Sequence, residues 1–486
     1  MGELRRIRVR FAPSPTGFLH VGGLRTALYN FLFARRHHGT FVLRIEDTDR
    51  SRYVEGAVDN LIETLRWAGL QFDEGPGVGG AYGPYVQSER VPIYRQHVDS
   101  LIEKGRAYRC FCTPDRLELM RKAQERSGAP TKYDRKCVGL SKEEVEKNIR
   151  SGMPSVVRMK VPDATSVIFH DVVRERVEFS SDLIDDQVLL KSDGYPTYHL
   201  ANVVDDHLMG ITHVIRGEEW LPSTPKHVLL YYFFGWILPT FAHLPLLLNP
   251  DRTKLSKRQG DVAVEEYRKK GYLPDALVNF VSLLGWNPGT EQEFFGLEDL
   301  VDQFSLDRVN KAGAIFNLEK LKWLNEEHLR KKSESELLKM LRAELQQAPS
   351  ANREYSDQYL LSVIRVMRER VSFVREIAEK GAYFFSPPNE YEKDVINKRW
   401  KVETPEHLQQ LITMYETLQE PTKESYESGL QKTAESLGIG NGELIHAVRL
   451  AVSGTGGGPG VYDILSILGK EESIRRMKQA VKSIKK

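Results

Sequence analysis

The sequence predicts an α/β fold built on a parallel sheet, interrupted by an inserted α+β domain and followed by all-α domains. Residues 7 to 95 alternate apolar, β-rich runs such as Phe41 to Ile45 with helical runs such as Val54 to Ala68. This alternation returns between Asp182 and Leu248. Beyond about residue 260 the pattern is almost wholly helical, with expected helices that include 357 to 379.

The first elements predict a strand, a tight turn and a helix. An apolar run, Ile7 to Phe11, leads through a glycine-rich turn into Leu24 to Ala34, whose apolar residues recur at helical spacing. Glycines such as Gly22 allow backbone to approach a ligand, and the N-H groups at a helix start suit phosphate. His20 lies where such phosphates would bind.

A change in the sequence pattern, from alternating strands and helices to charged helical stretches, predicts an inserted domain from about residue 96 to 190. Charged helical stretches, Pro114 to Arg126 and Ser141 to Ile149, precede strand-like segments such as Val156 to Val161. The nucleotide-binding type of α/β fold accommodates such an interruption.

Composition indicates an ordinary soluble protein of about three domains. Lys and Arg number 69 against 67 Asp and Glu, so any RNA-binding surface must be a local patch. Three cysteines argue against a disulfide framework and for a reducing compartment, which predicts a cytoplasmic protein. Met1 to Arg6 contains no apolar signal core, and the longest apolar run, Val228 to Leu238, is too short for a membrane span.

A lysine-rich segment complements the glycine-rich turn. Lys254 and Lys257 are flexible charges that can meet the charge developing as a phosphoanhydride breaks, and Ser256 adds a hydroxyl. The pair His20-Val-Gly-Gly23 and Lys254-Leu-Ser-Lys-Arg258 resembles the two signatures of class I aminoacyl-tRNA synthetases. Gly23 stands where that class pattern has a histidine.

Four further segments narrow the resemblance to the glutamyl-tRNA synthetases, and the helical tail narrows it to their bacterial type. They are Arg10-Phe-Ala-Pro-Ser-Pro-Thr-Gly17, Arg44-Ile-Glu-Asp-Thr-Asp-Arg50, Asp193-Gly-Tyr-Pro-Thr-Tyr-His199 and Val214-Ile-Arg-Gly-Glu-Glu-Trp220. The resemblance implies a Rossmann-type catalytic domain that activates glutamate with ATP and transfers it to tRNA(Glu), with Mg²⁺ carried by ATP. It also implies that ATP-pyrophosphate exchange requires tRNA.

Two arginines are candidate clamps for glutamate. A dicarboxylic amino acid needs cations for two carboxylates, and a bidentate guanidinium suits a carboxylate well. Arg10 and Arg216 fit this need, although both could instead be exposed charges at strand ends. The resemblance implies that the pocket is completed by Ser14, Glu46, Tyr198 and Asn202, with Glu46 taking the ammonium.

The glutamate carboxylate is already a nucleophile, so catalysis should depend on alignment at the α-phosphate and on charge stabilisation. The expected catalytic residues are His20, Lys254 and Lys257. The resemblance implies an ATP site formed by His20, Gly22, Glu219, Trp220 and Lys257. For Trp220, a place in the core is the alternative.

The three cysteines resemble the zinc-binding insertion of some family members. Cys110, Cys112 and Cys137 would supply thiolates, and Gly139 stands where those members have a histidine. The resemblance implies that Tyr133 could supply a phenolate as the fourth ligand, or that water fills this position, and three reduced cysteines that merely pack are an equally weighted alternative. Asp205-Asp206-His207 is interpreted as structural hydrogen bonding in preference to a metal site.

The expected domain boundaries follow the changes of pattern and the resemblance. They are 1–95 and 191–258 for the two catalytic halves, 96–190 for the acceptor-stem insertion, 259–333 for a stem-contact domain, and 334–388 and 389–486 for two anticodon-binding domains.

The helical tail predicts recognition of the tRNA. Arg370 and Arg449 match anticodon-region arginines of the family, and either could instead be a solvated helix charge. A nondiscriminating enzyme that also charges tRNA(Gln) is a close alternative, and a small-molecule adenylating ligase is a more distant one. We expect a monomer.

Overall fold

The computed structural model describes residues 6–255, 262–347 and 354–485. It divides into two compact units, Met1–Lys270 with Pro274–Lys320 and Gly271–Leu273 with Leu321–Lys486. Ser256, Lys257 and Arg258, from the predicted lysine-rich segment, lie outside the described residues.

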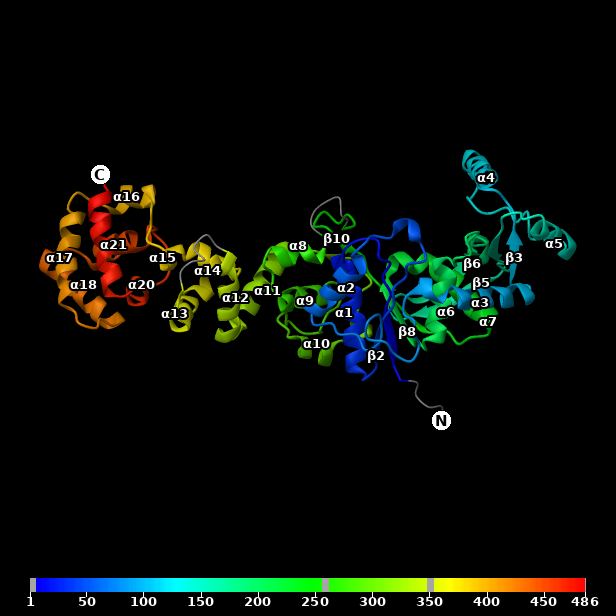
Figure 1. Ribbon diagram of the computed structural model, residues 1–486, viewed down its shortest axis with the longest axis horizontal. Helices are drawn as coiled ribbons and strands as arrows, with labels where there is room; N and C mark the ends of the chain where they lie inside the picture. Colours follow the sequence, from blue (N-terminus) through cyan, green and yellow to red (C-terminus); the bar gives the residue numbers. More distant parts are fainter. Residues whose placement is uncertain (1–5, 256–261, 348–353, 486) are drawn as a thin grey trace. The chain divides into compact units, whose positions relative to one another are not determined.

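The predicted strand, turn and helix open the first unit (Figure 1). Strand β1 (Arg8–Phe11) is followed by helix α1 (Val21–Arg36) and by strand β2 (Thr40–Leu43), which runs parallel to β1 with Arg10 opposite Val42. Strand β8 (His213–Gly217) lies on the other side of β1, because the Thr212 amide donates to the Arg8 carbonyl at 2.9 Å. Segments about two hundred residues apart in sequence therefore lie side by side here.

A four-stranded sheet has the order β6-β5-β9-β8. Strand β9 (Thr240–Leu244) is parallel to both β8 and β5 (Ser166–Asp171), and β5 forms an antiparallel hairpin with β6 (Glu175–Ser180). The β5-β6 hairpin comes from the sequence expected to form the insertion. Its pairing of Asp171 with Phe241 attaches it to the sheet that carries β8.

A second, antiparallel sheet contains β3 (Ala107–Cys110), β4 (Val156–Met159) and β7 (Val188–Leu190). The two charged helices predicted nearby are α4 (Pro114–Arg126) and α5 (Lys142–Arg150). Ser141 begins α5 through a capping box with Glu144, in which each side chain bonds the other residue's backbone N-H.

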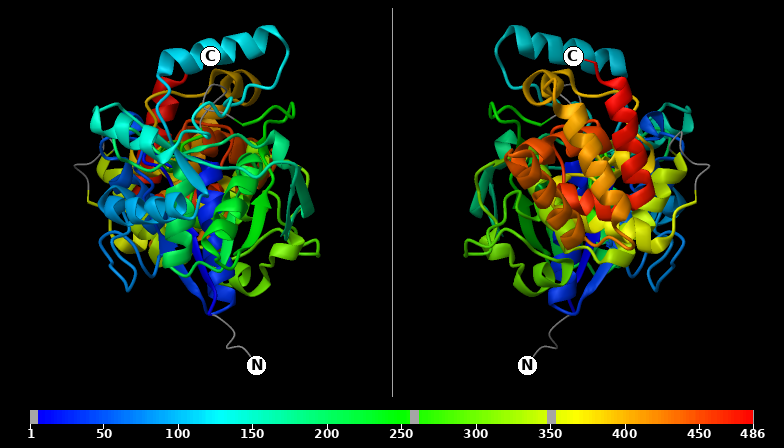
Figure 2. Two further views of the ribbon diagram at one scale, coloured as in Figure 1. Left: turned by 90° about the vertical axis from the view of Figure 1, so that its right-hand side faces the viewer. Right: turned by 90° about the vertical axis from the view of Figure 1, so that its left-hand side faces the viewer.

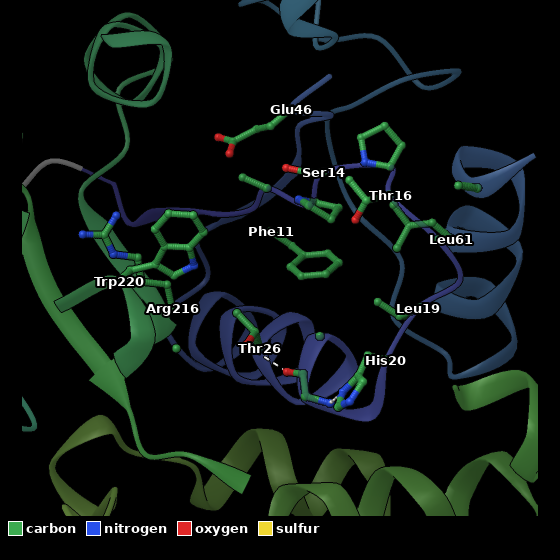
Figure 3. A pocket seen from close by; sticks show the side chains of 18 of the residues that line it. Phe11, Ser14, Thr16, Leu19, His20, Thr26, Glu46, Leu61, Arg216 and Trp220 are labelled. Carbon is green, nitrogen blue, oxygen red and sulfur yellow. Dashed lines mark hydrogen bonds between the residues drawn. The ribbon is translucent and has the colours of Figure 1, made fainter. Parts of the chain in front are cut away.

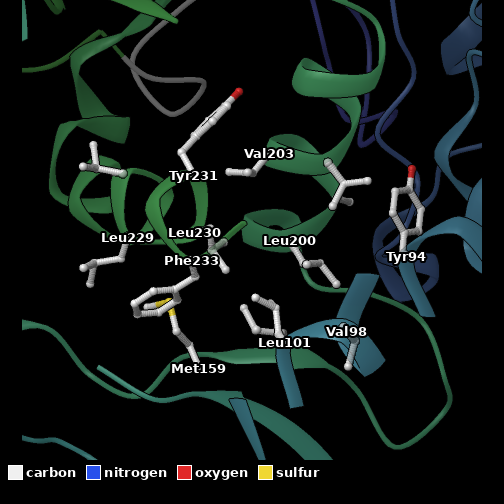
Figure 4. Close-up of a cluster of buried hydrophobic side chains, with 14 of the residues drawn as sticks. Tyr94, Val98, Leu101, Met159, Leu200, Val203, Leu229, Leu230, Tyr231 and Phe233 are labelled. Atoms are coloured by element: carbon white, nitrogen blue, oxygen red, sulfur yellow. The ribbon is translucent and has the colours of Figure 1, made fainter. Parts of the chain in front are cut away.

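One hydrophobic core joins this sheet to three helices, α3 (Val91–Glu103), α6 (Tyr198–Leu208) and α7 (Thr224–Phe234). Figure 4 shows Leu101, Met159, Leu200 and Phe233 converging from α3, β4, α6 and α7. The apolar run from Val228 is thus largely a buried helix, which ends where Gly235 adopts φ +74°. Over the described ranges, no helix combines the length and the hydropathy that a membrane crossing requires.

The remaining elements of the first unit are short. They are α2 (Ala57–Trp67), α8 (Val264–Lys269), α9 (Pro274–Ser282), α10 (Leu297–Gln303), the parallel pair β10 (Leu247–Leu248) and β11 (Ala314–Ile315), and the 3-10 turns η1 (Arg50–Arg52), η2 (Gln87–Arg90), η3 (Ser181–Leu183), η4 (Glu218–Ser223) and η5 (Leu306–Arg308).

The second unit is helical, as the sequence predicts. Its elements, with α11 beginning just before its boundary, are α11 (Leu318–Lys331), α12 (Glu334–Gln347), α13 (Asp357–Met367), η6 (Arg368–Arg370), α14 (Arg375–Lys380), α15 (Ala382–Phe385), α16 (Lys393–Arg399), α17 (Thr404–Thr417), α18 (Lys423–Leu437), α19 (Asn441–Ser453), α20 (Val461–Leu468) and α21 (Lys470–Ser483). Helix α17 packs against both α18 and α21, as the orange and red ribbons of Figure 2 show.

The prediction of a single helix over 357 to 379 is wrong, because the helical structure is interrupted between α13 and α14. At the break, the Ser372 amide donates to the Glu376 carboxylate at 2.7 Å. The Ser372 carbonyl accepts from Asn325 Nδ2 at 2.6 Å, and its hydroxyl donates to Glu326 at 2.6 Å. Side chains of α11 and α14 thus satisfy backbone groups that a continuous helix would have paired internally.

Candidate active site

His20 is the N-cap of α1. Its Nδ1 accepts a hydrogen bond from the Gly22 amide at 2.9 Å, which fixes the imidazole at the helix start. The backbone beside it pairs with the segment that follows the lysine-rich loop, through Val21 N to Val262 O at 2.8 Å and Val264 N to Leu19 O at 2.9 Å. The segment Val262 to Val264, a few residues beyond the lysine-rich signature, therefore lies beside the start of α1.

A cavity of about 460 Å³ lies between the turn after β1, the start of α1 and the end of β8. Figure 3 shows Glu46 and Ser14 on one side of this cavity, Arg216 and Trp220 on a second, and His20 at the start of α1. Ten of the predicted site residues line it, namely Arg10, Ser14, His20, Gly22, Glu46, Tyr198, Asn202, Arg216, Glu219 and Trp220. Lys254 is exposed and is not among the lining residues.

Arg216 is buried and surrounded by neutral acceptors. Its guanidinium donates to four groups, which are Tyr198 OH at 3.1 Å, Thr224 Oγ1 at 2.8 Å, His227 Nδ1 at 3.2 Å and His243 Nε2 at 3.1 Å. Among the described residues, no carboxylate lies within ion-pair distance of Arg216. No carboxylate of the described residues therefore neutralises its charge, and Arg216 is not an exposed strand-end charge.

The two histidines beside Arg216 are neutral at neutral pH. Burial lowers the pKa of His243 to about 4, against the opposing effect of its hydrogen bond to Asp171. Burial, and then the charge of Arg216, hold the pKa of His227 well below its ordinary value. A neutral imidazole offers one nitrogen lone pair, so each ring can accept a hydrogen from the guanidinium.

Arg10 and Glu46 belong to a buried charge network. Asp206 accepts from Arg10 Nε at 3.0 Å and from Arg44 Nη1 at 2.7 Å. Glu46 Oε1 accepts from Arg44 Nη2 at 3.0 Å and from Asn202 Nδ2 at 3.2 Å. Burial raises the pKa of Glu46, although Arg44 and Arg10 act in the opposite direction. Arg44 is a central residue to which sequence reasoning assigned no role.

The interpretation of Asp205 and Asp206 as structural is confirmed. Asp205 accepts from Arg90 at 2.8 Å and from Tyr94 at 2.7 Å, while Asp206 holds Arg10 and Arg44. These carboxylates therefore neutralise buried arginines behind the cavity.

Trp220 lies on η4 and its ring stacks obliquely on Tyr198, with ring centroids 4.3 Å apart. It is 36% exposed and lines the cavity, so the alternative of a core tryptophan is wrong. An indole in this place offers an apolar face to a ligand at the edge of the cavity.

The cavity also contains residues that the sequence did not single out, among them Thr16, Phe18, Arg52 and Leu61. They belong to the turn after β1, to η1 and to α2; Thr16 lies within the Arg10–Gly17 segment, but no motif assigned a role to any of the four. His227 and His243 were missed because only the pairing of β8 with β9 and the packing of α7 place them beside Arg216.

The predicted metal ligands lie together in the first unit. The sulfur atoms of Cys110, Cys112 and Cys137 are all within 4.8 Å of one another. Tyr133 OH is 3.3 Å from the sulfur atoms of both Cys110 and Cys112. The Arg158 guanidinium lies over the Tyr133 ring at 4.1 Å. Cysteine sulfur is a usual ligand of structural zinc, and the Tyr133 hydroxyl lies beside the three sulfur atoms.

The two arginines predicted for the anticodon lie in the second unit. Arg370 is exposed on η6, and Arg449 on α19 donates to the Pro459 carbonyl at 2.6 Å. Burial and then the like charge of Arg370 lower the pKa of Arg449, whereas Tyr383 acts in the opposite direction. The two arginines and Tyr383 therefore form one cluster.

Comparison with known proteins agrees with the fold. Residues 6–323 match the family described as tRNA synthetases class I (E and Q), catalytic domain, and residues 336–481 match an anticodon binding domain. Together, the fold and the site define a class I tRNA synthetase, and the predicted fold class is confirmed.

The chain belongs to the glutamate-tRNA ligase family. The glutamate-tRNA ligase of Chloroherpeton thalassium is 53% identical over 98% of this chain and 97% of its own length, and that of Chlorobium chlorochromatii is 53% identical over 99% of both. A crystal structure of a glutamate tRNA ligase from Elizabethkingia meningosepticum, in complex with its amino acid, is 40% identical with a TM-score of 0.94. It covers 99% of this chain and 100% of that chain.

Proposed function

We propose that this protein ligates L-glutamate to tRNA(Glu) through a glutamyl-adenylate. The proposal is supported by the names of its relatives and, in the cavity, by one observation above all. A buried Arg216 with no carboxylate partner among the described residues lies in the same cavity as the carboxylate of Glu46. A free amino acid carries both an ammonium and carboxylates, and this pair of opposite charges complements it.

In the proposed glutamate site, Arg216 and Arg10 bind the carboxylates and Glu46 binds the ammonium. Ser14, Tyr198 and Asn202 supply further polar groups from the cavity wall. Because Asp206 already neutralises Arg10 in part, we assign the stronger carboxylate contact to Arg216.

ATP would occupy the part of the cavity between α1 and η4. A glutamate carboxylate oxygen attacks the α-phosphorus, and the bond to diphosphate breaks; the adenylate then passes its glutamyl group to the terminal adenosine and releases AMP. His20 and Gly22 at the start of α1 would bind the phosphates. Glu219 and Trp220 would contact the nucleoside. Lys254 and Lys257 would stabilise the charge on the departing diphosphate. Mg²⁺ would accompany ATP.

The function is tested by glutamylation of tRNA(Glu) and by ATP-pyrophosphate exchange in the presence of tRNA. Arg216→Lys should raise the KM for glutamate on the order of 100-fold, because a bidentate charge-assisted contact is lost. The KM for ATP should change little. An unchanged KM for glutamate in this variant would contradict the assigned site.

The same assay with a tRNA(Gln) transcript tests the choice of tRNA. The match of residues 336–481 to an anticodon binding domain supports RNA as the acceptor and disfavours a small-molecule ligase. We assign anticodon contacts to Arg370 and Arg449. Comparable kcat/KM values for both transcripts would show that the enzyme is nondiscriminating and charges tRNA(Gln) as well as tRNA(Glu).

Zinc is the metal that best fits Cys110, Cys112, Tyr133 and Cys137. It would be structural, since four protein donors leave no open position, and it would hold the loop after β3 to the segment before α5. Metal analysis of the purified protein should find one zinc per chain, and Cys110→Ser should lower both zinc content and thermal stability. Full stability after removal of all metal would contradict this role.

We also propose that the enzyme acts as a monomer in the cytoplasm. The three free cysteines are consistent with a reducing compartment. Light scattering of the purified protein across a concentration range tests the monomer.

A further inference from the structure

A buried chain of hydrogen bonds leads from the β5-β6 hairpin to the cavity. Asp171, at the end of β5, and His243, on β9, are both fully buried. Asp171 Oδ2 lies 2.6 Å from His243 Nδ1, and Arg216 Nε donates to His243 Nε2 at 3.1 Å. The side chains thus connect in the order Asp171, His243, Arg216.

The chemistry of these groups fixes the direction of each hydrogen bond. An ionised carboxylate only accepts, so the His243 hydrogen must be on Nδ1. Nε2 then carries a lone pair, which the Arg216 N-H requires. The opposite tautomer would direct an N-H at the N-H of Arg216, and its only acceptor on that side among the described residues would be Thr224 Oγ1, 3.1 Å from Nε2, which already accepts from Arg216 Nη2.

His227 holds another nitrogen of the guanidinium in a similar way. Its Nδ1 accepts from Arg216 Nη1 at 3.2 Å, while its Nε2 lies 3.1 Å from Nδ1 of His199. With Thr224 Oγ1 on Nη2, each guanidinium nitrogen has a neutral acceptor. This arrangement fixes the orientation of the guanidinium without cancelling its charge.

We propose that Asp171 and His243 are positioning residues for glutamate binding: Asp171 selects the tautomer of His243, and His243 orients Arg216 toward the substrate carboxylate. This inference rests on the function proposed above. Neither residue lines the cavity, so both act through Arg216.

The alternative is a structural pair that merely fills the junction of β5 and β9. Asp171 Oδ1 does have a structural task, because it accepts from the amides of Val173 at 3.0 Å, Arg174 at 2.8 Å and His243 at 3.3 Å. A useful variant must therefore keep these backbone hydrogen bonds to Oδ1 and change only Oδ2, the atom that faces His243 Nδ1.

Asp171→Asn meets this requirement. Its Oδ1 can still accept from these three amides, while its NH₂ group takes the place of Oδ2 and forces the His243 hydrogen onto Nε2. We expect the KM for glutamate to rise tenfold or more, with the KM for ATP and the thermal midpoint nearly unchanged. Asp163→Asn, an exposed Asp beyond β4 whose partner is Arg135, is the matched control and should leave both KM values within twofold.

Two further measurements separate positioning from structure. Histidine ¹⁵N NMR should show the Nδ1-H tautomer for His243 in the wild type and the Nε2-H tautomer in Asp171→Asn. His243→Asn should raise the KM for glutamate as well, because it can keep a donor for Asp171 but has no acceptor at the Nε2 position.

Unchanged KM values for glutamate in both variants, or equal increases for glutamate and ATP with a lower thermal midpoint, would overturn the inference. If the wild type shows no glutamate-dependent exchange with tRNA present, the proposed function fails instead. In that case an unaltered His243 tautomer in Asp171→Asn would still contradict the proposal that Asp171 selects the tautomer of His243.

Discussion

At the scale of single residues, a substitution at the start of α1 is expected to keep or raise stability and to lower the rate of catalysis. Gly22 lies in the first turn of α1, where alanine is favoured over glycine by about 1 kcal/mol. A Cβ at this position would lie 3.2 Å from His20 Nδ1, closer than ordinary contact. The imidazole would have to shift by a few tenths of an ångström.

We therefore expect Gly22→Ala to keep or raise the thermal midpoint while lowering kcat for glutamylation on the order of tenfold. Gly442→Ala on α19 is the control, because a Cβ there meets nothing within 4 Å. The comparison needs steady-state kinetics and thermal unfolding of both variants. Equal kcat in the two would show that the position of His20 is not critical.

The buried histidines predict loss of stability in acid. His243 titrates near 6.5 when unfolded, whereas its pKa in the folded protein is about 4. Between these pH values the unfolded state binds a proton at His243 that the folded state does not bind. The free energy of unfolding therefore falls as the pH drops from about 6.5 to about 4. The expected slope is about 1.4 kcal/mol per pH unit for each such histidine.

Urea unfolding at pH 7 and pH 5 measures this effect. His243→Asn should show a smaller loss between the two pH values than the wild type, even if it is less stable at pH 7. The same slope in both proteins would mean that His243 is not responsible for the acid sensitivity.

At the scale of elements, local patterns predicted the first strand, turn and helix, the two charged helices and most helices of the tail. Periodicity did not predict the break between α13 and α14, because partners from α11 and α14 stabilise it. Nor could it show that the β5-β6 hairpin pairs with β9. Motifs identified ten residues of the cavity, but not Arg44, His227 or His243, whose roles depend on contacts between distant segments.

The break between α13 and α14 predicts a large effect of Asn325. Its side chain accepts from the Leu273 amide at 2.8 Å and donates to the Ser372 carbonyl at 2.6 Å, and it is fully buried. Asn325→Ala leaves both backbone groups unpaired, so we expect a loss of about 2 to 4 kcal/mol. Urea unfolding checks this value, with the exposed Asn441→Ala as control; a change below about 0.5 kcal/mol would contradict it.

At the scale of the whole molecule, the proposed roles divide between the two units. The residues proposed to bind glutamate and ATP all lie in the first unit, and the proposed anticodon arginines, Arg370 and Arg449, lie in the second. Arg449→Ala should therefore raise the KM for tRNA about tenfold and weaken its salt dependence, while the KM for glutamate stays unchanged. Lys398→Ala, on the exposed side of α16, is the control. A matching rise in the KM for glutamate would argue against this separation.

The attachment of the β5-β6 hairpin to β9 has a practical consequence for the design of chimeras. Transplanting residues 96–190 from a relative as one module would replace Asp171 together with the strand that borders β9. A graft that leaves Ser166–Ser180 in place, and exchanges only the outer segments, should preserve amino acid affinity far better than a transfer of the complete block.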